Sequence, residues 1–480
     1  MRLGQKSAIF FASKIGSSVL GFFATVYFAR ELGSAILGDY FLVLAVVGWL
    51  TIVAKAGITK SITKRVSEGV DKSQHIVAGA VLILALTSAT STGIFLFRGQ
   101  INQYLGAPLY WVVILLLFGR IGFSVVMAVF RGDHLVHIEA ALGISQSVSR
   151  ITLQVAGVAA GLSIFALLGG EIVSFISVGL AAIILLPTLF GRSLGMTVPD
   201  RSHFSSITNF AKYSWLERAK GGTYSLMDKL VLGFFVSSSL IGIYSICWNI
   251  ATVMGIFSKS LSSTFFPEMS RLSGEAGRPR IVNYLDDTLA FSGLFVIPGF
   301  VGSVVVGEGV LNLYGSEFRQ GYAILVLLVA SILVHSYYRQ VVSTIDALDR
   351  PDLSFQANIL FVGSNIVLNF LLVFYFGWLG AAVATLVSVV CGFVFAYFLL
   401  GRILTFTIPW KEIRKQVVAA IIMGLLVKAV LYSSKTIGAS PFEVRIVIPA
   451  VTFGATVYFG LLFLISGRFR LKVTENIPVQ

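Results

Sequence analysis

The chain carries a series of apolar segments, each about as long as a membrane-spanning helix, and these segments limit its folds most strongly. The first runs from Ser7 to Ala29 and the second from Tyr40 to Thr59. A helix needs about 20 mostly apolar residues to cross the ~30 Å hydrocarbon layer of a bilayer. Because backbone polar groups cannot stay unpaired in lipid, such segments cross it as helices. The sequence therefore predicts an all-α polytopic membrane protein.

About fourteen segments of this kind follow one another along the chain. They lie at roughly 7–29, 39–58, 76–97, 109–130, 140–164, 169–190, 212–236, 240–266, 284–306, 320–345, 353–376, 378–400, 417–433 and 446–466. With 56% hydrophobic and only 12% charged residues in 480, the composition excludes a soluble domain. A transmembrane barrel would instead show short strands of alternating polarity.

The distribution of Lys and Arg predicts the orientation of these helices. If the N-terminus is cytoplasmic, most of the 36 Lys and Arg residues fall in cytoplasmic tails and loops. The external loops hold Arg30, Arg98, Arg319, Lys435 and Arg445. This bias predicts a multi-pass protein of the cytoplasmic membrane with both termini in the cytoplasm. The net charge of +14 then reflects topology, and we expect no nucleic-acid partner.

Two helical hairpins of the chain resemble each other. In each hairpin, both helices contain one aligned cationic residue, and the second helix begins with a Gly-x-Tyr sequence. One constant shift aligns Gly38 with Gly242, Tyr40 with Tyr244, Lys14 with Arg218 and Lys55 with Lys259. Because six helices separate the hairpins, both cross the membrane in the same direction. The repeat predicts two lobes related by an axis along the membrane normal, an arrangement known in transporters.

This repeat sets the predicted domain organisation. An N-terminal lobe covers 1–192 with helices 1–6, and a C-terminal lobe covers 212–402 with helices 7–12. A cytoplasmic linker at 193–211 connects them, and 403–480 holds helices 13 and 14 with the C-terminal tail. Two pseudo-symmetric six-helix lobes thus leave two C-terminal helices outside the repeat.

The aligned cations predict a binding site. A lysine inside a membrane helix costs roughly 2.5–3.5 kcal/mol on insertion scales, so it normally faces the bundle interior or a wet cavity. A single lysine has an alternative, because it can extend to the headgroups while small neighbours pack the helices closely. Four cations in one repeat register favour a shared cationic cavity that binds an anionic group. They are Lys14, Lys55, Arg218 and Lys259.

Other cations within the predicted spans extend this set. Arg120 and Arg150 lie near the middle of the fourth and fifth helices. They either widen the cationic surface or form structural ion pairs. Lys229 shares the face of its helix that carries Arg218, because eleven residues make about three helical turns.

Two pairs of residues are candidates for auxiliary roles. Glu217 and Asp228 share one face of the seventh helix. They either bind a coupling proton or sodium ion, or compensate the charges of neighbouring lysines. Arg30 and Asp39 flank the first external loop, and Asp39 either caps the N-terminus of the second helix or forms an external gate with Arg30.

Motifs for catalysis or metal binding are missing from the sequence. It contains no phosphate-binding glycine loop followed by Lys-Ser or Lys-Thr, no His-Glu-x-x-His and no Gly-x-Ser-x-Gly. Cys247 and Cys391 lie in apolar segments and give no metal or disulfide pattern. We therefore expect no catalytic residue, no metal and no cofactor. Transport would instead couple to a proton or sodium gradient or to the membrane potential.

Three stretches of the chain resemble one transporter family. Val26 to Leu50 is similar to the N-terminal signature of the Wzx-type polysaccharide flippases, which belong to the multidrug/oligosaccharidyl-lipid/polysaccharide (MOP) exporter superfamily. Ile241 to Leu272 resembles that family's eighth helix with its following proline, and Ala357 to Val390 resembles its helix 11–12 hairpin. The resemblance implies a bundle of two lobes that rock to open a central cavity to each side in turn.

The resemblance also implies a substrate class. Related lipid II flippases line their cavity with cations from helices 1, 2 and 8, where Lys14, Lys55 and Lys259 stand here. The implied substrate is an oligosaccharide or polysaccharide repeat unit on a polyprenyl or dolichyl (pyro)phosphate. Membrane lipids and glycan-assembly enzymes are the further partners. Independently of the family, convergent Lys and Arg side chains suit a phosphate head that leaves water.

Two other functions are alternatives. A MATE-like exporter of small cationic molecules would call for carboxylates in the cavity, whereas the N-terminal lobe offers lysines. A membrane glycosyltransferase or polymerase would need a sizeable loop with catalytic carboxylates. The loops of this chain are too short for such a domain, so we expect a transporter and not an enzyme.

Overall fold

The computed structural model of the protein describes residues 3–190, 198–272, 274, 277–436, 440 and 442–475. Within these ranges, side chains are described except at 3–19, 187–190, 212–220, 223, 435, 436, 473 and 475. Helices form all of the regular secondary structure in this part of the chain, which contains no strand. The predicted fold class, an all-α polytopic membrane protein, is confirmed.

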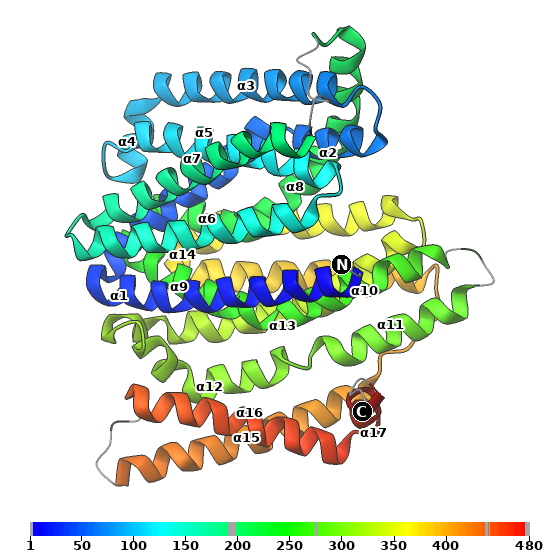
Figure 1. Cartoon of the computed structure of the whole chain (residues 1–480). Coiled ribbons are helices and arrows are strands. Elements are labelled where there is room, and N and C mark those ends of the chain that lie inside the picture. Colours follow the sequence, from blue (N-terminus) through cyan, green and yellow to red (C-terminus); the bar gives the residue numbers. More distant parts are fainter. Residues whose placement is uncertain are drawn as a thin grey trace. The chain divides into compact units, whose positions relative to one another are not determined.

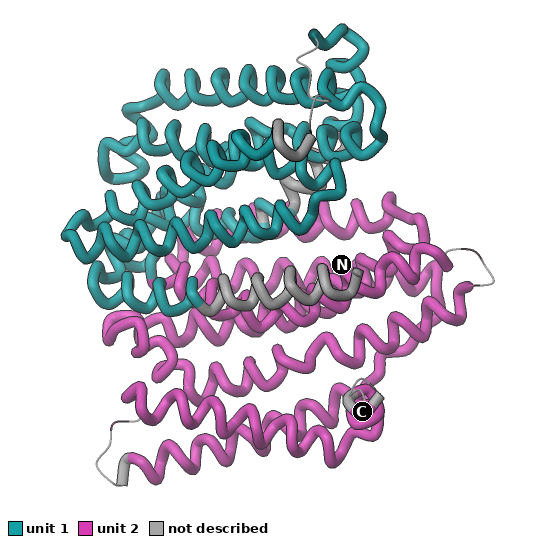
Figure 2. Tube along the Cα trace, viewed as in Figure 1, with its two compact units in different colours: residues 1–242 teal, residues 243–480 magenta. Residues whose placement is uncertain are grey.

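Residues 1–242 form the first of two compact units (Figure 2). Its helices are α1 (Leu3–Lys55), α2 (Ile58–Glu68), α3 (Lys72–Leu96), α4 (Arg98–Leu105), α5 (Tyr110–Gly132), α6 (Val136–Ala159), α7 (Ser163–Phe190), α8 (Arg201–Phe235) and the start of α9 (Ser238–Met254) (Figure 1). α1 packs against α5, α6, α7 and α8. α1 is therefore central to the packing of this unit.

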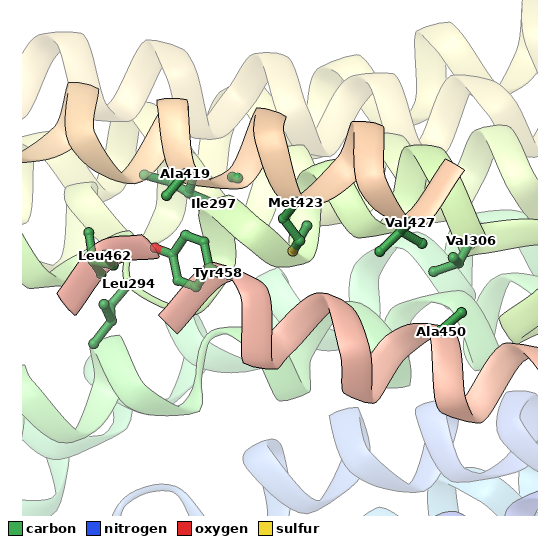
Figure 3. Close-up of a cluster of buried hydrophobic side chains, with 10 residues drawn as sticks. Leu294, Ile297, Val306, Ala419, Met423, Val427, Ala450, Tyr458 and Leu462 are labelled. Carbon is green, nitrogen blue, oxygen red and sulfur yellow. The ribbon is translucent and has the colours of Figure 1, made fainter. Parts of the chain in front are cut away.

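Residues 243–480 form the second unit. It contains the rest of α9, then α10 (Ile256–Arg271), α11 (Arg278–Ser292), α12 (Val296–Asn312), the 3-10 helix η3 (Ser316–Gly321), α13 (Tyr322–Ala347), α14 (Pro351–Gly401), α15 (Trp410–Thr436), α16 (Val444–Ile465) and α17 (Gly467–Glu475). Buried apolar side chains join α12, α15 and α16, and Figure 3 shows Met423 and Tyr458 among them. The two helices outside the repeat are thus packed onto this unit.

Two long helices each consist of two parts joined at one glycine. Gly33 in α1 has φ 77° and ψ 175°, and Gly377 in α14 has φ 57° and ψ −140°. Positive φ values of this kind are readily accessible to glycine alone. The sequence correctly placed the second junction at 377, between predicted helices ending at 376 and starting at 378. It was wrong about the first, because it expected a loop at 30–38 where the structure has a single non-helical residue.

The number of membrane spans stays a prediction. In the described ranges, nine helices are long and apolar enough to cross a membrane, or ten if α9 and α10, bent by 45°, form one span. Helical backbone covers most of each of the fourteen predicted ranges. The two lobes predicted from the repeat, 1–192 and 212–402, likewise remain a prediction.

α8 begins with a capping arrangement at the end of the linker between the predicted lobes. The Asp200 carboxylate accepts hydrogen bonds from the backbone N–H groups of Ser202, at 2.9 Å, and His203, at 3.3 Å. Hydrogen bonds to this carboxylate, chiefly from the Ser202 side chain, lower the pKa of Asp200 to about 2. The carboxylate is therefore ionised at neutral pH, and its negative charge interacts favourably with the positive N-terminal end of the α8 dipole.

Four small residues of the first unit form a close helix crossing. A Cβ added to Gly38 would overlap the backbone carbonyl oxygen of Ser238, and one added to Gly242 would overlap that of Ser34. Small residues four apart let helix backbones approach closely within a membrane. The shift that aligns Gly38 with Gly242 also aligns Ser34 with Ser238. The crossing therefore consists of one contact made twice, once from each copy of the repeat.

Candidate functional site

Lys55 stands at a break in the helical backbone. It is the last residue of α1, and Ala56 and Gly57 follow with φ values of 39° and 80° before α2 begins at Ile58. Irregular backbone at membrane depth is tolerated where it is buried in protein or lines a cavity. The sequence predicted one continuous helix over 39–58, and this was wrong. Its one local signal for the break was Gly57.

The Lys55 side chain lines a polar pocket within the first unit. The lysine is 9% exposed and borders a cavity of about 330 Å³. The pocket is also lined by Thr59 of α2, by Ser124, Met127 and Arg131 of α5, and by Glu139 and Gly143 of α6. Arg131 and Glu139 form an ion pair with each other. The charges that line the pocket therefore sum to one positive charge.

Arg120 lies on the side of α5 that faces this pocket. It is one helical turn before Ser124, and steps of three and four residues lead from there to Met127 and Arg131. In the part of the chain that the structure describes, Arg120 forms no ion pair or hydrogen bond. Of the two predicted interpretations, this placement favours a wider cationic surface over a structural ion pair.

Arg150 belongs to a buried polar network that joins α1, α6 and α7. The Tyr40 hydroxyl donates a hydrogen bond to Glu171 Oε1 at 3.0 Å and accepts one from Gln154 Nε2 at 3.2 Å. Arg150 Nη1 lies 3.6 Å from the same Glu171 oxygen, which makes an ion pair longer than a hydrogen bond. For Arg150, the expected alternative of a structural ion pair is thus observed.

Glu171 is the residue of this network that the sequence analysis missed. It is 8% exposed and lies two turns into α7, in the run ALLGGEIVSF. A carboxylate inside an apolar run is a functional signal in itself, because burying it in a membrane is costly. The prediction concentrated on repeated cations, and Glu171 takes no part in the repeat. Tyr40, by contrast, was singled out through the Gly-x-Tyr motif.

Lys229 is held apart from the pocket. Its ammonium lies 5.3 Å from the centre of the Phe41 ring, in the range of a cation–π contact. Phe41 and Lys55 are fourteen residues apart on α1, which is about 21 Å along a helix. Lys229 and the neighbouring Asp228 are both buried. The structure therefore does not bring Lys229 together with Lys55.

The remaining predicted site residues are placed differently or are not described. Lys259 is exposed and lies in the first turn of α10, just after the break at Gly255, whereas its repeat partner Lys55 precedes a break. Arg30 is exposed, and Asp39 hydrogen-bonds with the Ser238 side chain. Three predicted residues have side chains outside the described part of the chain. They are Lys14, Glu217 and Arg218. A pocket shared by all four repeat cations thus stays a prediction.

Comparison with known proteins shows which family the chain belongs to. The sequence profile of the family described as "Polysaccharide biosynthesis protein" matches residues 3–273, more than half of the chain. The chain belongs to this family. The region that matches the polysaccharide biosynthesis protein family includes the Lys55 pocket and the Tyr40–Glu171 network.

Two relatives of this family member come from Haloferax volcanii. The protein named "Probable flippase AglR" is 32% identical, and the match covers 99% of this chain and 98% of the relative. The protein named "Probable low-salt glycan biosynthesis flippase Agl15" is 28% identical over 95% of this chain and 91% of its own. Among solved structures, the lipid II flippase MurJ in an inward closed conformation is similar, with a TM-score of 0.78 at 17% identity over 97% of this chain and 100% of its own. The predicted resemblance to glycan flippases is thereby confirmed.

Proposed function

We propose that the protein is a flippase that moves a glycan linked to a lipid (pyro)phosphate across the cytoplasmic membrane. The observation that carries the proposal is the buried Lys55 in a polar pocket of a chain whose relatives are named as flippases. The glycan is an oligosaccharide or a polysaccharide repeat unit. A flippase makes and breaks no covalent bond in its substrate, so the protein is a transporter and not an enzyme.

The chemistry of the head group explains why a lysine suits this pocket. A phosphate loses its hydration when it enters the bilayer, and a charge-assisted hydrogen bond from an ammonium group offsets part of that cost. The head group must also be released on the other side. Lysine acts as a point charge and lacks the bidentate geometry of arginine, so it binds phosphate with less geometric specificity. Thr59 and Ser124 add hydroxyl groups beside it.

Alternating access between two lobes completes the proposed cycle. Lys14, Arg218 and Lys259 would join Lys55 in the path of the head group, with Arg120 nearby. Glu217 and Asp228 are candidates for binding a coupling ion, and Arg30 and Asp39 for a gate. Both termini would lie in the cytoplasm, where glycan-assembly enzymes load a polyprenyl or dolichyl carrier. The positive-inside distribution of Lys and Arg supports this orientation.

A reconstitution experiment tests the proposed function. The purified protein is placed in liposomes with a fluorescent disaccharide on polyprenyl pyrophosphate in the inner leaflet. We expect the labelled lipid to reach the outer leaflet, where a membrane-impermeant quencher detects it, much faster than in protein-free liposomes. The same vesicles are loaded with a cationic dye. Dye export without lipid movement would support an exporter of small molecules and contradict the flippase.

A further inference from the structure

The ion pair between Arg150 and Glu171 is asymmetric in a way that suggests which partner moves. The Glu171 side chain is 10% exposed and its carboxylate is also held by the Tyr40 hydroxyl at 3.0 Å. The Arg150 side chain is 27% exposed and stands 3.6 Å from the carboxylate. The carboxylate therefore keeps a hydrogen-bond donor when the arginine leaves, whereas the arginine is long, flexible and open to its surroundings.

The face of α6 that carries Arg150 leads to the Lys55 pocket. Glu139 and Gly143 line that pocket, and steps of three and four residues along the helix lead from Gly143 through Gln146 to Arg150. The distance from Gly143 to Arg150 is about 10 Å along the helix. An added Cβ at Gly143 would meet no atom within 4 Å, so the space on this face is open there. Arg150 thus lies about two helical turns from Gly143, on the face of α6 that also lines the pocket.

We infer that Glu171 is an internal counter-anion that the phosphate of the substrate displaces from Arg150. The inference deepens the proposed function and rests on it. In the empty protein the carboxylate neutralises the guanidinium inside the membrane, where an unpaired charge is costly. When the head group enters, Arg150 exchanges the carboxylate for the phosphate, while Tyr40 continues to bind Glu171. Glu171 is therefore a positioning residue that sets how strongly Arg150 binds the substrate.

A consequence is that the Glu171 carboxylate and the phosphate of the substrate compete for Arg150. A side chain without the carboxylate charge at position 171 no longer competes for Arg150, so the affinity for phosphate rises. The charged or titratable groups that face Glu171 are Tyr40 on α1 and Arg150 on α6. α5 also packs on α7, and its mid-helix charged residue is Arg120. None of these three groups carries a negative charge at neutral pH. Glu171 is therefore the anion among them that competes with the phosphate for Arg150.

A double-mutant cycle with a simple anionic lipid tests the inference. Binding of farnesyl phosphate to the full chain in detergent is measured for the wild type, Glu171→Gln, Arg150→Gln and the double variant. Glutamine retains an acceptor for Tyr40, and thermal unfolding shows that each variant is folded. We expect Glu171→Gln to bind farnesyl phosphate about tenfold more tightly than the wild type, an effect the size of one charge-assisted hydrogen bond.

The controls separate this inference from the proposed function. Glu308→Gln changes the net charge equally but removes a partner of Arg319 in the second unit, so its affinity should match the wild type. Without Arg150, the Glu171→Gln change should produce no gain. If the wild type binds and Glu171→Gln binds equally or more weakly, or gains equally without Arg150, the inference is wrong. If no protein binds farnesyl phosphate, the proposed function fails and the inference with it.

Discussion

Replacing Lys55 with methionine is expected to reduce transport of a lipid-linked glycan by about ten- to a hundredfold while the protein stays folded. A hydrogen bond from a charged group contributes roughly 1.5–3 kcal/mol, and each 1.4 kcal/mol corresponds to about a factor of ten. Methionine keeps the unbranched length of the lysine stem, so the packing around the pocket is preserved. Initial rates in the liposome assay measure the effect, and thermal unfolding in detergent verifies the fold.

Two lysine variants make the Lys55 result specific. Lys55→Arg retains the charge and should keep a substantial part of the rate. Lys428 is an exposed lysine within α15, so Lys428→Met removes a lysine of an apolar helix that does not line the Lys55 pocket. Its rate should equal that of the wild type. Equal rates for Lys55→Met and Lys428→Met would show that the Lys55 pocket does not carry the head group.

Replacing Gly38 or Gly242 with alanine is expected to destabilise the protein by about 3 kcal/mol or more, at the upper end of the cost of overpacking. The added methyl group meets a backbone carbonyl oxygen of the facing helix in both cases. Backbone atoms cannot rotate away as a side chain does, so the helices must separate. The change is measured as a lower unfolding temperature or a loss of folded protein after purification in detergent.

The matched control for the crossing is Gly21, on the same helix. A Cβ at Gly21 would meet no atom within 4 Å, so alanine fits there. Alanine in a helix is about 0.8–1.0 kcal/mol more favourable than glycine, so Gly21→Ala should be neutral or slightly stabilising. If Gly38→Ala and Gly21→Ala have the same stability, the close approach of the helices at the crossing is not real.

The helices could be predicted from the sequence because membrane spans depend on length and apolarity alone. The junction at Gly377 could also be predicted, because two apolar runs meet there at a glycine. The single-residue junction at Gly33 and the break after Lys55 could not. They depend on which helices pack alongside, since only tertiary contacts can hold Ala56 in a left-handed conformation.

The candidate site was only partly predictable for a similar reason. Periodicity tells which residues share a face, and the sequence repeat pointed to Lys55, which is buried. It does not tell which face meets which neighbour. Arg150 therefore remained ambiguous until Glu171 was found beside it, and Lys229 was grouped with cations although it lies against Phe41. A repeat in sequence also does not fix local backbone, as Lys55 and Lys259 show.

The reciprocal crossing of Ser34 and Gly38 with Ser238 and Gly242 limits how the two copies can diverge. Each glycine fits against the main chain of the other copy, so a larger residue at either position reduces the space that its counterpart needs. Which residue position 38 can accept is therefore limited by the backbone at position 238, and which residue position 242 can accept by the backbone at position 34.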